Sequence, residues 1–183
     1  MGTPFLATVT QWSRGEYPDA NNLEDDLQII AGLTNGLGFR SDDLASLGSV
    51  NGDGTPVSGV IEKTEDTDLF ALNSAAGPIS LSAVNATNPN LDLQIRLLAE
   101  SGEVVAQSSP ANDLHASLQT TVSGGTYHVE VSGVGNGDLQ SGYSNYGSLG
   151  SYTLVANTPQ GVPVVVDILS PGDSSISLPA GTG

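Results

Sequence analysis

The chain has 183 residues, of which 38% are apolar and none is cysteine. This composition is typical of one globular domain with flanking segments and excludes disulfide bridges, thiolate metal sites and cysteine nucleophiles. Four basic residues against twenty acidic ones give a formal net charge of −16, which excludes nucleic acid and anionic membranes as partners because phosphate binding depends on Lys and Arg clusters.

Residues 1–48 differ in pattern from the rest of the chain. The acidic run 24–26 followed by Leu27 and Ile30 predicts a short helix, with Asn22 as its N-cap and its end near Gly36 or Gly38. One helix and an extended piece cannot enclose a core. We therefore expect this segment to belong to a larger body, and Trp12 to pack in a core or an interface.

From about residue 58 to residue 157 the apolar residues recur with a period of two, which is typical of strands with one buried face. The predicted inward sets are Phe70 and Leu72; Ile79, Leu81 and Ala83; Leu91, Leu93, Ile95 and Leu97; Leu114, Ala116 and Leu118; Tyr127, Val129 and Val131; and Tyr152, Leu154 and Ala156. Glycine-rich turn signals separate these runs. Six to eight short strands without a helical period predict an all-β fold, an antiparallel and jelly-roll-like β-sandwich, over residues 49–158.

The last segment, 159–183, contains the apolar run 162–169 and a second short apolar run at 175–178. An isolated two-stranded hairpin is marginal in water. We expect a linker and the first strands of a further β domain, and docking as an extra strand on the sandwich is the alternative. From Val162 the segment resembles the first strands of an immunoglobulin-like repeat, which implies an immunoglobulin-like domain.

The sequence offers no recognisable catalytic set. His115 and His128 fall at outward positions of predicted strands, and HExxH, Gly-x-Ser-x-Gly, the phosphate-binding loop and the dinucleotide fingerprint do not occur. We therefore predict no catalytic residue in this chain, and a serine hydrolase ranks last among the hypotheses because no motif places a base beside a serine.

Carboxylates are the chemistry that the sequence does offer. Asp53, Asp66 and Asp68 lie in or beside predicted turns, and calcium takes six to eight oxygen ligands from such loops. Asp66 and Asp68 form the best pair, because they immediately precede a strand and could share one ion. The competing interpretation is ordinary turn chemistry, in which Asp side chains bond their own backbone.

An ordered series of short motifs resembles the bacterial pre-peptidase C-terminal domain. The motifs are 58–62 (SGVIE), 66–70 (DTDLF), 91–97 (LDLQIRL), 125–131 (GTYHVEV) and 150–154 (GSYTL). The resemblance covers roughly residues 48–158. It implies a β-sandwich appended to a secreted peptidase.

A second resemblance concerns the N-terminal segment. Met1 with Gly2, the run 9–17 (VTQWSRGEY) and the acidic run 24–26 (EDD) look like the closing segment of a metzincin-type zinc metallopeptidase. By this likeness Met1 matches the methionine of the turn beneath the zinc, residues 1–48 are the end of the catalytic domain, and the zinc ligands lie upstream of this chain.

Together these patterns predict a non-catalytic accessory module of a secreted zinc metallopeptidase, extracellular, with its signal peptide upstream. It would assist folding or secretion, or hold the protein or peptide substrate of the parent enzyme, and it would contact neighbouring domains of the same chain. Stabilisation by calcium is a secondary hypothesis, and zinc would belong only to the upstream catalytic part. The alternative is a stand-alone β-sandwich that binds carbohydrate or protein.

Overall fold

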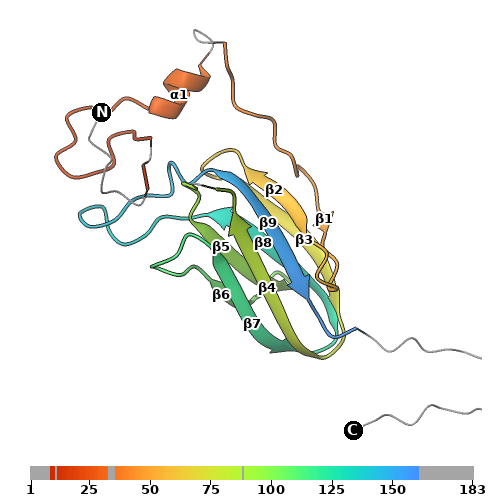
Figure 1. Cartoon of the computed structure of the whole chain (residues 1–183). Coiled ribbons are helices and arrows are strands. Elements are labelled where there is room, and N and C mark those ends of the chain that lie inside the picture. Colours follow the sequence, from red (N-terminus) through yellow and green to blue (C-terminus); the bar gives the residue numbers. More distant parts are fainter. Residues whose placement is uncertain (1–8, 11, 33–35, 88, 161–183) are drawn as a thin grey trace, which may run out of the picture.

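The computed structural model describes residues 9–10, 12–32, 36–87 and 89–160. Two sheets pack face to face (Figure 1). The five-stranded sheet has the order β1-β3-β8-β5-β6, and the four-stranded sheet has the order β2-β9-β4-β7. The strands are β1 (Gly48–Ser49), β2 (Val57–Ile61), β3 (Thr67–Ser74), β4 (Gly77–Asn85), β5 (Leu93–Ala99), β6 (Val104–Ser108), β7 (Ala116–Val122), β8 (Gly125–Gly133) and β9 (Gly150–Asn157).

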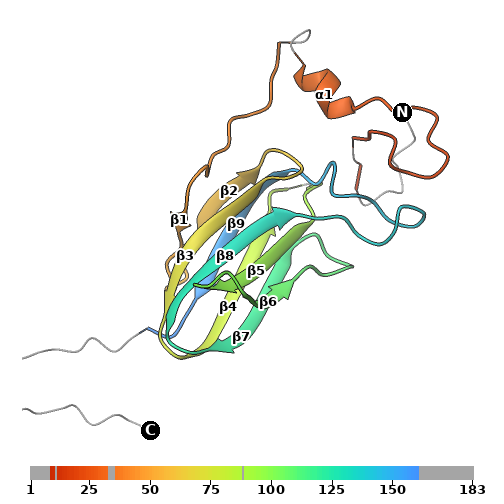
Figure 2. The same ribbon diagram turned by 180° about the vertical axis from the view of Figure 1, so that it is seen from behind.

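The strand pairing confirms the predicted β-sandwich. All pairs are antiparallel except β1 with β3, which run parallel where Gly48 faces Phe70. Figure 2 shows the five-stranded sheet in front, with β3, β8, β5 and β6 side by side. Because successive side chains of a strand point to opposite faces, each strand contributes one set of residues to the layer between the sheets.

That layer is the hydrophobic core, and it contains the predicted inward residues. The side chains of Leu72, Leu93, Ile95, Leu97 and Leu154 are fully buried. Leu114 is an exception, since it is half-buried and precedes β7. Burial of this apolar surface is the dominant favourable term in folding.

The N-terminal helix is shorter than predicted and begins at a different residue. Helix α1 spans Asp26–Ala31, and its N-cap is Asp25, whose carboxylate accepts a hydrogen bond from the Gln28 amide. The prediction of Asn22 as N-cap was wrong, because the Asn22 side chain closes a local turn by accepting from the Glu24 amide. The predicted end near Gly36 or Gly38 was also wrong, since Gly32 is already extended.

The N-terminal segment docks on the end of the sandwich through Tyr146, which lies in the β8–β9 loop and is 3% exposed. Its hydroxyl donates to the Asp25 carboxylate and accepts from the Leu27 amide. The Arg14 guanidinium lies 5.1 Å from the centre of the Tyr146 ring. Helix α1 thus lies at the end of the sandwich opposite to the end of β9 (Figure 1).

Three other predictions concern Trp12, His115 and the C-terminal segment. Trp12 is 50% exposed, so it does not pack in a core within the described residues, and packing in an interface stays a prediction. His115 lies just before β7 instead of within a strand, and its Nδ1 accepts from the Asn85 amide. The further domain expected after residue 160 lies outside the described residues. No helix in the described ranges is long and apolar enough to cross a membrane.

Candidate cation site

Carboxylates gather where the chain enters the sandwich. The turn between β2 and β3 carries Glu62 and Asp66, and Asp68 is the second residue of β3. The connection from α1 brings Asp42 and Asp43 to the same place, because the Asp43 carboxylate accepts from the Val60 amide at 3.1 Å. Two segments that are distant in sequence therefore supply one acidic cluster.

Asp42, Asp66 and Asp68 form the core of this cluster. One carboxylate oxygen from each lies within 4.8 Å of the others. Asp66 also accepts from the Glu62 amide at 3.0 Å, which closes the β2–β3 turn. Asp42 accepts from the Leu44 amide at 2.8 Å. The backbone thus fixes the two outer carboxylates while leaving each a second oxygen.

Asp68 is the buried member, with no exposed surface. Its Oδ2 accepts from the Tyr152 hydroxyl, whereas its Oδ1 is buried and has no partner among the described residues. Burial raises the pKa of Asp68 to about 6, against the lowering effect of the Tyr152 hydrogen bond. Because an unpaired buried carboxylate costs free energy, this oxygen needs a proton or a cation.

Gly59 makes room for that hydrogen bond. A Cβ at this position of β2 would overlap the Tyr152 hydroxyl and lie 2.7 Å from Asp68 Oδ2. Gly59 pairs with Tyr152 across β2 and β9, so the missing side chain lets the tyrosine reach through the core to β3 of the facing sheet. The glycine in the SGVIE motif therefore has a packing role at this site.

Glu62 is the second buried carboxylate, with a side chain that is 2% exposed. Its Oε1 accepts from the Asp43 amide at 3.2 Å and lies 3.7 Å from Arg40 Nε, while its Oε2 has no partner within the described ranges. Burial raises the pKa of Glu62 to about 7, and the carboxyls of Asp66 and Asp43 raise it further in the same direction. Among the described residues, Arg40 is the one basic side chain within salt-bridge distance of this acidic cluster.

This donor set fits a hard cation. Every candidate ligand is an oxygen, which suits calcium or magnesium, whereas a structural zinc site would need imidazole or thiolate. The buried, unpartnered Oδ1 of Asp68 is the observation that argues for an ion over a chance gathering of surface charge. Carboxylate oxygens are eligible ligands for either ion.

The predicted metal residues do not all come together. Asp66 and Asp68 meet, but Asp53 forms an isolated bridge with Asn157 at the end of β9, whereas the cluster lies beside the first residues of that strand. The Asp53 carboxylate accepts from the Thr55 amide at 2.9 Å, so its side chain stabilises the local turn, as the competing interpretation predicts. This hydrogen bond lowers the pKa of Asp53. Met1 lies outside the described residues.

Sequence reasoning missed Asp42 and Glu62. The signal for Asp42 was the short acidic run 42–43 just before the sandwich, but nothing in the sequence gives its distance from residue 66 in space. Glu62 follows the inward-facing Ile61, so the period of two would place it in water. The strand ends at Ile61, and the connection that precedes the sandwich places the Asp43 amide and Arg40 against the Glu62 carboxylate.

No protein-family model matches this chain, and no curated protein matches it. Solved structures give remote likenesses. The pre-peptidase C-terminal domain of collagenase from Bacillus anthracis has a TM-score of 0.47 and 21% identity, over 64% of this chain and 98% of that one.

Two further solved structures are less similar in sequence. PliG from Aeromonas hydrophila, a periplasmic inhibitor of g-type lysozyme, has a TM-score of 0.41 and 13% identity, over 61% of this chain and 96% of that one. The mitogen derived from Yersinia pseudotuberculosis has a TM-score of 0.42 and 12% identity, over 61% and 90%. The chain is thus a two-sheet β-sandwich, established by its own strand pairing and remotely similar to a pre-peptidase C-terminal domain.

Proposed function

We propose that this chain is a non-catalytic accessory module of a secreted zinc metallopeptidase, stabilised by calcium at Asp42, Asp66 and Asp68. Its β-sandwich would follow the catalytic domain, whose closing segment is residues 1–48. The module would assist folding or secretion of the parent enzyme or hold its protein substrate, since tethering raises the effective concentration of substrate near the catalytic centre.

One observation carries this proposal: the acidic cluster joins the N-terminal connection to the sandwich. Asp42 comes from the connection, and Asp66 and Asp68 come from the β2–β3 turn and β3. An ion held by all three would fix the sandwich relative to the segment that precedes it. The family motifs support the same interpretation, because DTDLF supplies both Asp66 and Asp68.

Docking of the N-terminal segment gives the proposal independent support. Tyr146 holds α1, and the Ser144 hydroxyl donates to Glu16 at 2.9 Å. These contacts tie the segment with the metzincin likeness to the sandwich end that also bears the cluster. An accessory module needs such a fixed joint to hold a substrate in register with its enzyme.

Thermal unfolding in calcium, magnesium and excess chelator tests the cation. An ion that binds only the folded state at a concentration of about 100 Kd stabilises by about 2.7 kcal/mol, so calcium should raise the Tm and magnesium should raise it less. Asp66→Asn should abolish the response, whereas the matched variant Asp53→Asn should keep it. Identical melts in calcium and chelator would contradict the calcium site.

The parent enzyme needs a separate test. The purified chain should show no chelator-sensitive cleavage of casein, and the gene sequence preceding the Met1 codon should encode an HExxH helix with a third histidine in the same frame. Cleavage by the purified chain would refute the accessory role. A stop codon and ribosome-binding site before Met1 would refute the peptidase parent and favour a stand-alone binding protein.

A further inference from the structure

The four-stranded sheet differs in charge from the rest of this acidic chain. Its strands β2, β9, β4 and β7 contain no Asp, Glu, Lys, Arg or His, although the chain has a formal net charge of −16. The five-stranded sheet, in contrast, carries Asp68, Arg96, His128 and Glu130. The outer face of the four-stranded sheet is therefore an uncharged surface on a strongly charged molecule.

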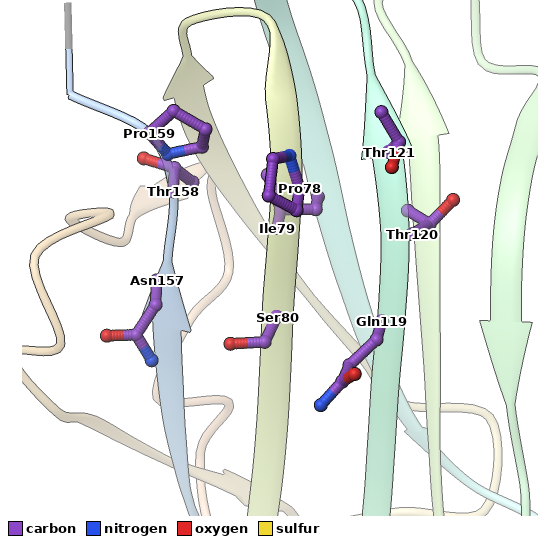
Figure 3. Close-up of a pocket in the computed structure, with 9 residues that line it drawn as sticks. All are labelled: Pro78, Ile79, Ser80, Gln119, Thr120, Thr121, Asn157, Thr158 and Pro159. Atoms are coloured by element: carbon purple, nitrogen blue, oxygen red, sulfur yellow. The ribbon is translucent and has the colours of Figure 1, made fainter. Parts of the chain in front are cut away.

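A groove of about 770 Å³ lies on this face, at the end where β9 finishes. Figure 3 shows Pro78 and Ser80 of β4 between two flanks of side chains, one from β7 and one from β9 and the residues after it. The pairing of Ser80 with both Gln119 and Asn157 places an amide on each side of a small serine. The serine thus forms the floor, and the longer amides form the walls.

The polar groups in the groove have hydrogen-bonding capacity to spare. Within the described ranges, no side-chain hydrogen bond is made by Ser80, Gln119, Thr121 or Asn157. Each amide offers two donors and an acceptor, and each hydroxyl offers one donor and two acceptor positions. A ligand that bound here would meet several free polar groups and no charged side chain among the residues that line the groove.

Backbone hydrogen bonds hold the β9 side of the groove in place without a ligand. The Pro159 carbonyl accepts from the Ala75 amide at 3.2 Å, and the Thr158 amide donates to the Gly52 carbonyl at 2.8 Å. These bonds hold the two residues after β9 against the β3–β4 turn and the 50–54 loop. A preformed wall lowers the ordering cost of binding.

We propose that this groove binds an uncharged oligosaccharide. Amide and hydroxyl groups pair with sugar hydroxyls, and the rings of Pro78 and Pro159 give apolar surface for the C–H face of a sugar ring. A charged glycan would find no counter-ion in the groove and would have to approach an acidic molecule. The volume lies within the range of about 300–1,000 Å³ that is typical of small-ligand sites.

An extended peptide fits this groove less well. Peptides that bind sheets usually add a strand at a free edge, and both edges of β4 are already paired, with β7 and β9. A ligand on this face must therefore be recognised by side chains alone. Sugar hydroxyls suit such recognition better than a peptide backbone, whose regularly spaced amides find no free strand edge along β4.

NMR titration of the full ¹⁵N-labelled chain tests the proposal. The probes are maltohexaose, cellohexaose, mannohexaose and chitohexaose, each at about 10 mM, a concentration that saturates a site with a Kd of about 1 mM. At least one probe should shift the backbone amides of Ser80, Gln119 and Asn157, and hexagalacturonate, which is anionic, should not. Absence of shifts with all four neutral probes, or shifts confined to other surfaces, would overturn the proposal.

Two matched variants assign the contact. Gln119→Ala should weaken the binding of the responding sugar about fivefold, the factor that one uncharged hydrogen bond confers. Gln107→Ala, the same change on the exposed edge strand β6 of the other sheet, should leave it unchanged. Equal loss of sugar binding in both variants would overturn the assignment. So would a neutral Gly-Ser peptide that shifts the same backbone amides when none of the sugars shifts them. This test is independent of the calcium and peptidase tests.

Discussion

Replacing the buried Asp68 by asparagine should stabilise this chain when divalent cations are absent. The introduced side chain would have the shape of the native one, and its amide oxygen could still accept from the Tyr152 hydroxyl. Its amide nitrogen would take the place of Oδ1, which has no partner within the described ranges, and would donate toward the carboxylates of Asp42 and Asp66. The change removes a buried negative charge without opening a cavity.

The magnitude follows from the pKa of Asp68, which burial raises from 3.8 to about 6 in the folded chain. A group whose folded pKa is raised contributes stability that is present below the unfolded pKa and is lost as the pH rises through the folded pKa. Ionised Asp68 therefore costs up to about 3 kcal/mol at about pH 7.5. Asp68→Asn should recover most of that cost at about pH 7.5 and almost none at about pH 4.

Urea unfolding followed by circular dichroism, in chelator at both pH values, measures the effect. The variant should gain about 2–3 kcal/mol in the free energy of unfolding at the higher pH, and it should lose the response to calcium. Asp53→Asn is the control, because that exposed carboxylate has a lowered pKa and should not stabilise the chain. Equal destabilisation by Asp68→Asn at both pH values would refute the reasoning.

Three further substitutions test the architecture. Gly59→Ala should destabilise the chain by about 2–4 kcal/mol and weaken the calcium response, because the new methyl group displaces the buried tyrosine–aspartate hydrogen bond; unfolding equal to the wild type would contradict this. Tyr146→Phe should speed amide exchange of α1 about tenfold without changing exchange in the sandwich, whereas Tyr17→Phe, at an exposed position, should change neither. Leu97→Ala should cost about 2–5 kcal/mol in urea unfolding, against less than about 0.5 kcal/mol for Val105→Ala on the exposed edge; similar costs would contradict the assigned core.

The sandwich was predictable from the sequence because each strand repeats one simple pattern. Between Leu91 and Leu97 every second residue is apolar, and the structure buries all four of these residues. Asp92, which the alternation places in water, is buried as well, and its carboxylate accepts from the Tyr143 hydroxyl. Period-two alternation reports directly on which face meets the core. Pairing partners were not predictable in the same way, since β2 pairs with β9 across most of the domain and no local signal records that choice.

The helix start and the acidic cluster show where local reasoning fails. Asn22 and Asp25 are both good N-caps by residue type. The structure uses Asp25, whose carboxylate also accepts from the Tyr146 hydroxyl, and the same hydroxyl accepts from the Leu27 amide in the first turn of the helix. The cluster depends on the course of residues 36–47, a connection without regular periodicity. The pair of Asp66 and Asp68 was predictable from spacing. The position of Asp42 beside them depends on tertiary structure, because it lies more than twenty residues earlier in the sequence.

The order of the strands has a consequence for how the chain folds as it is made. Strand β2 pairs only with β9, and β3 joins its sheet chiefly through β8. Neither sheet can close until the last strands have been synthesised, and contacts of such long sequence separation make folding slow. The complete sandwich therefore forms only after β9 has been synthesised, and the earlier strands wait for their partners until then.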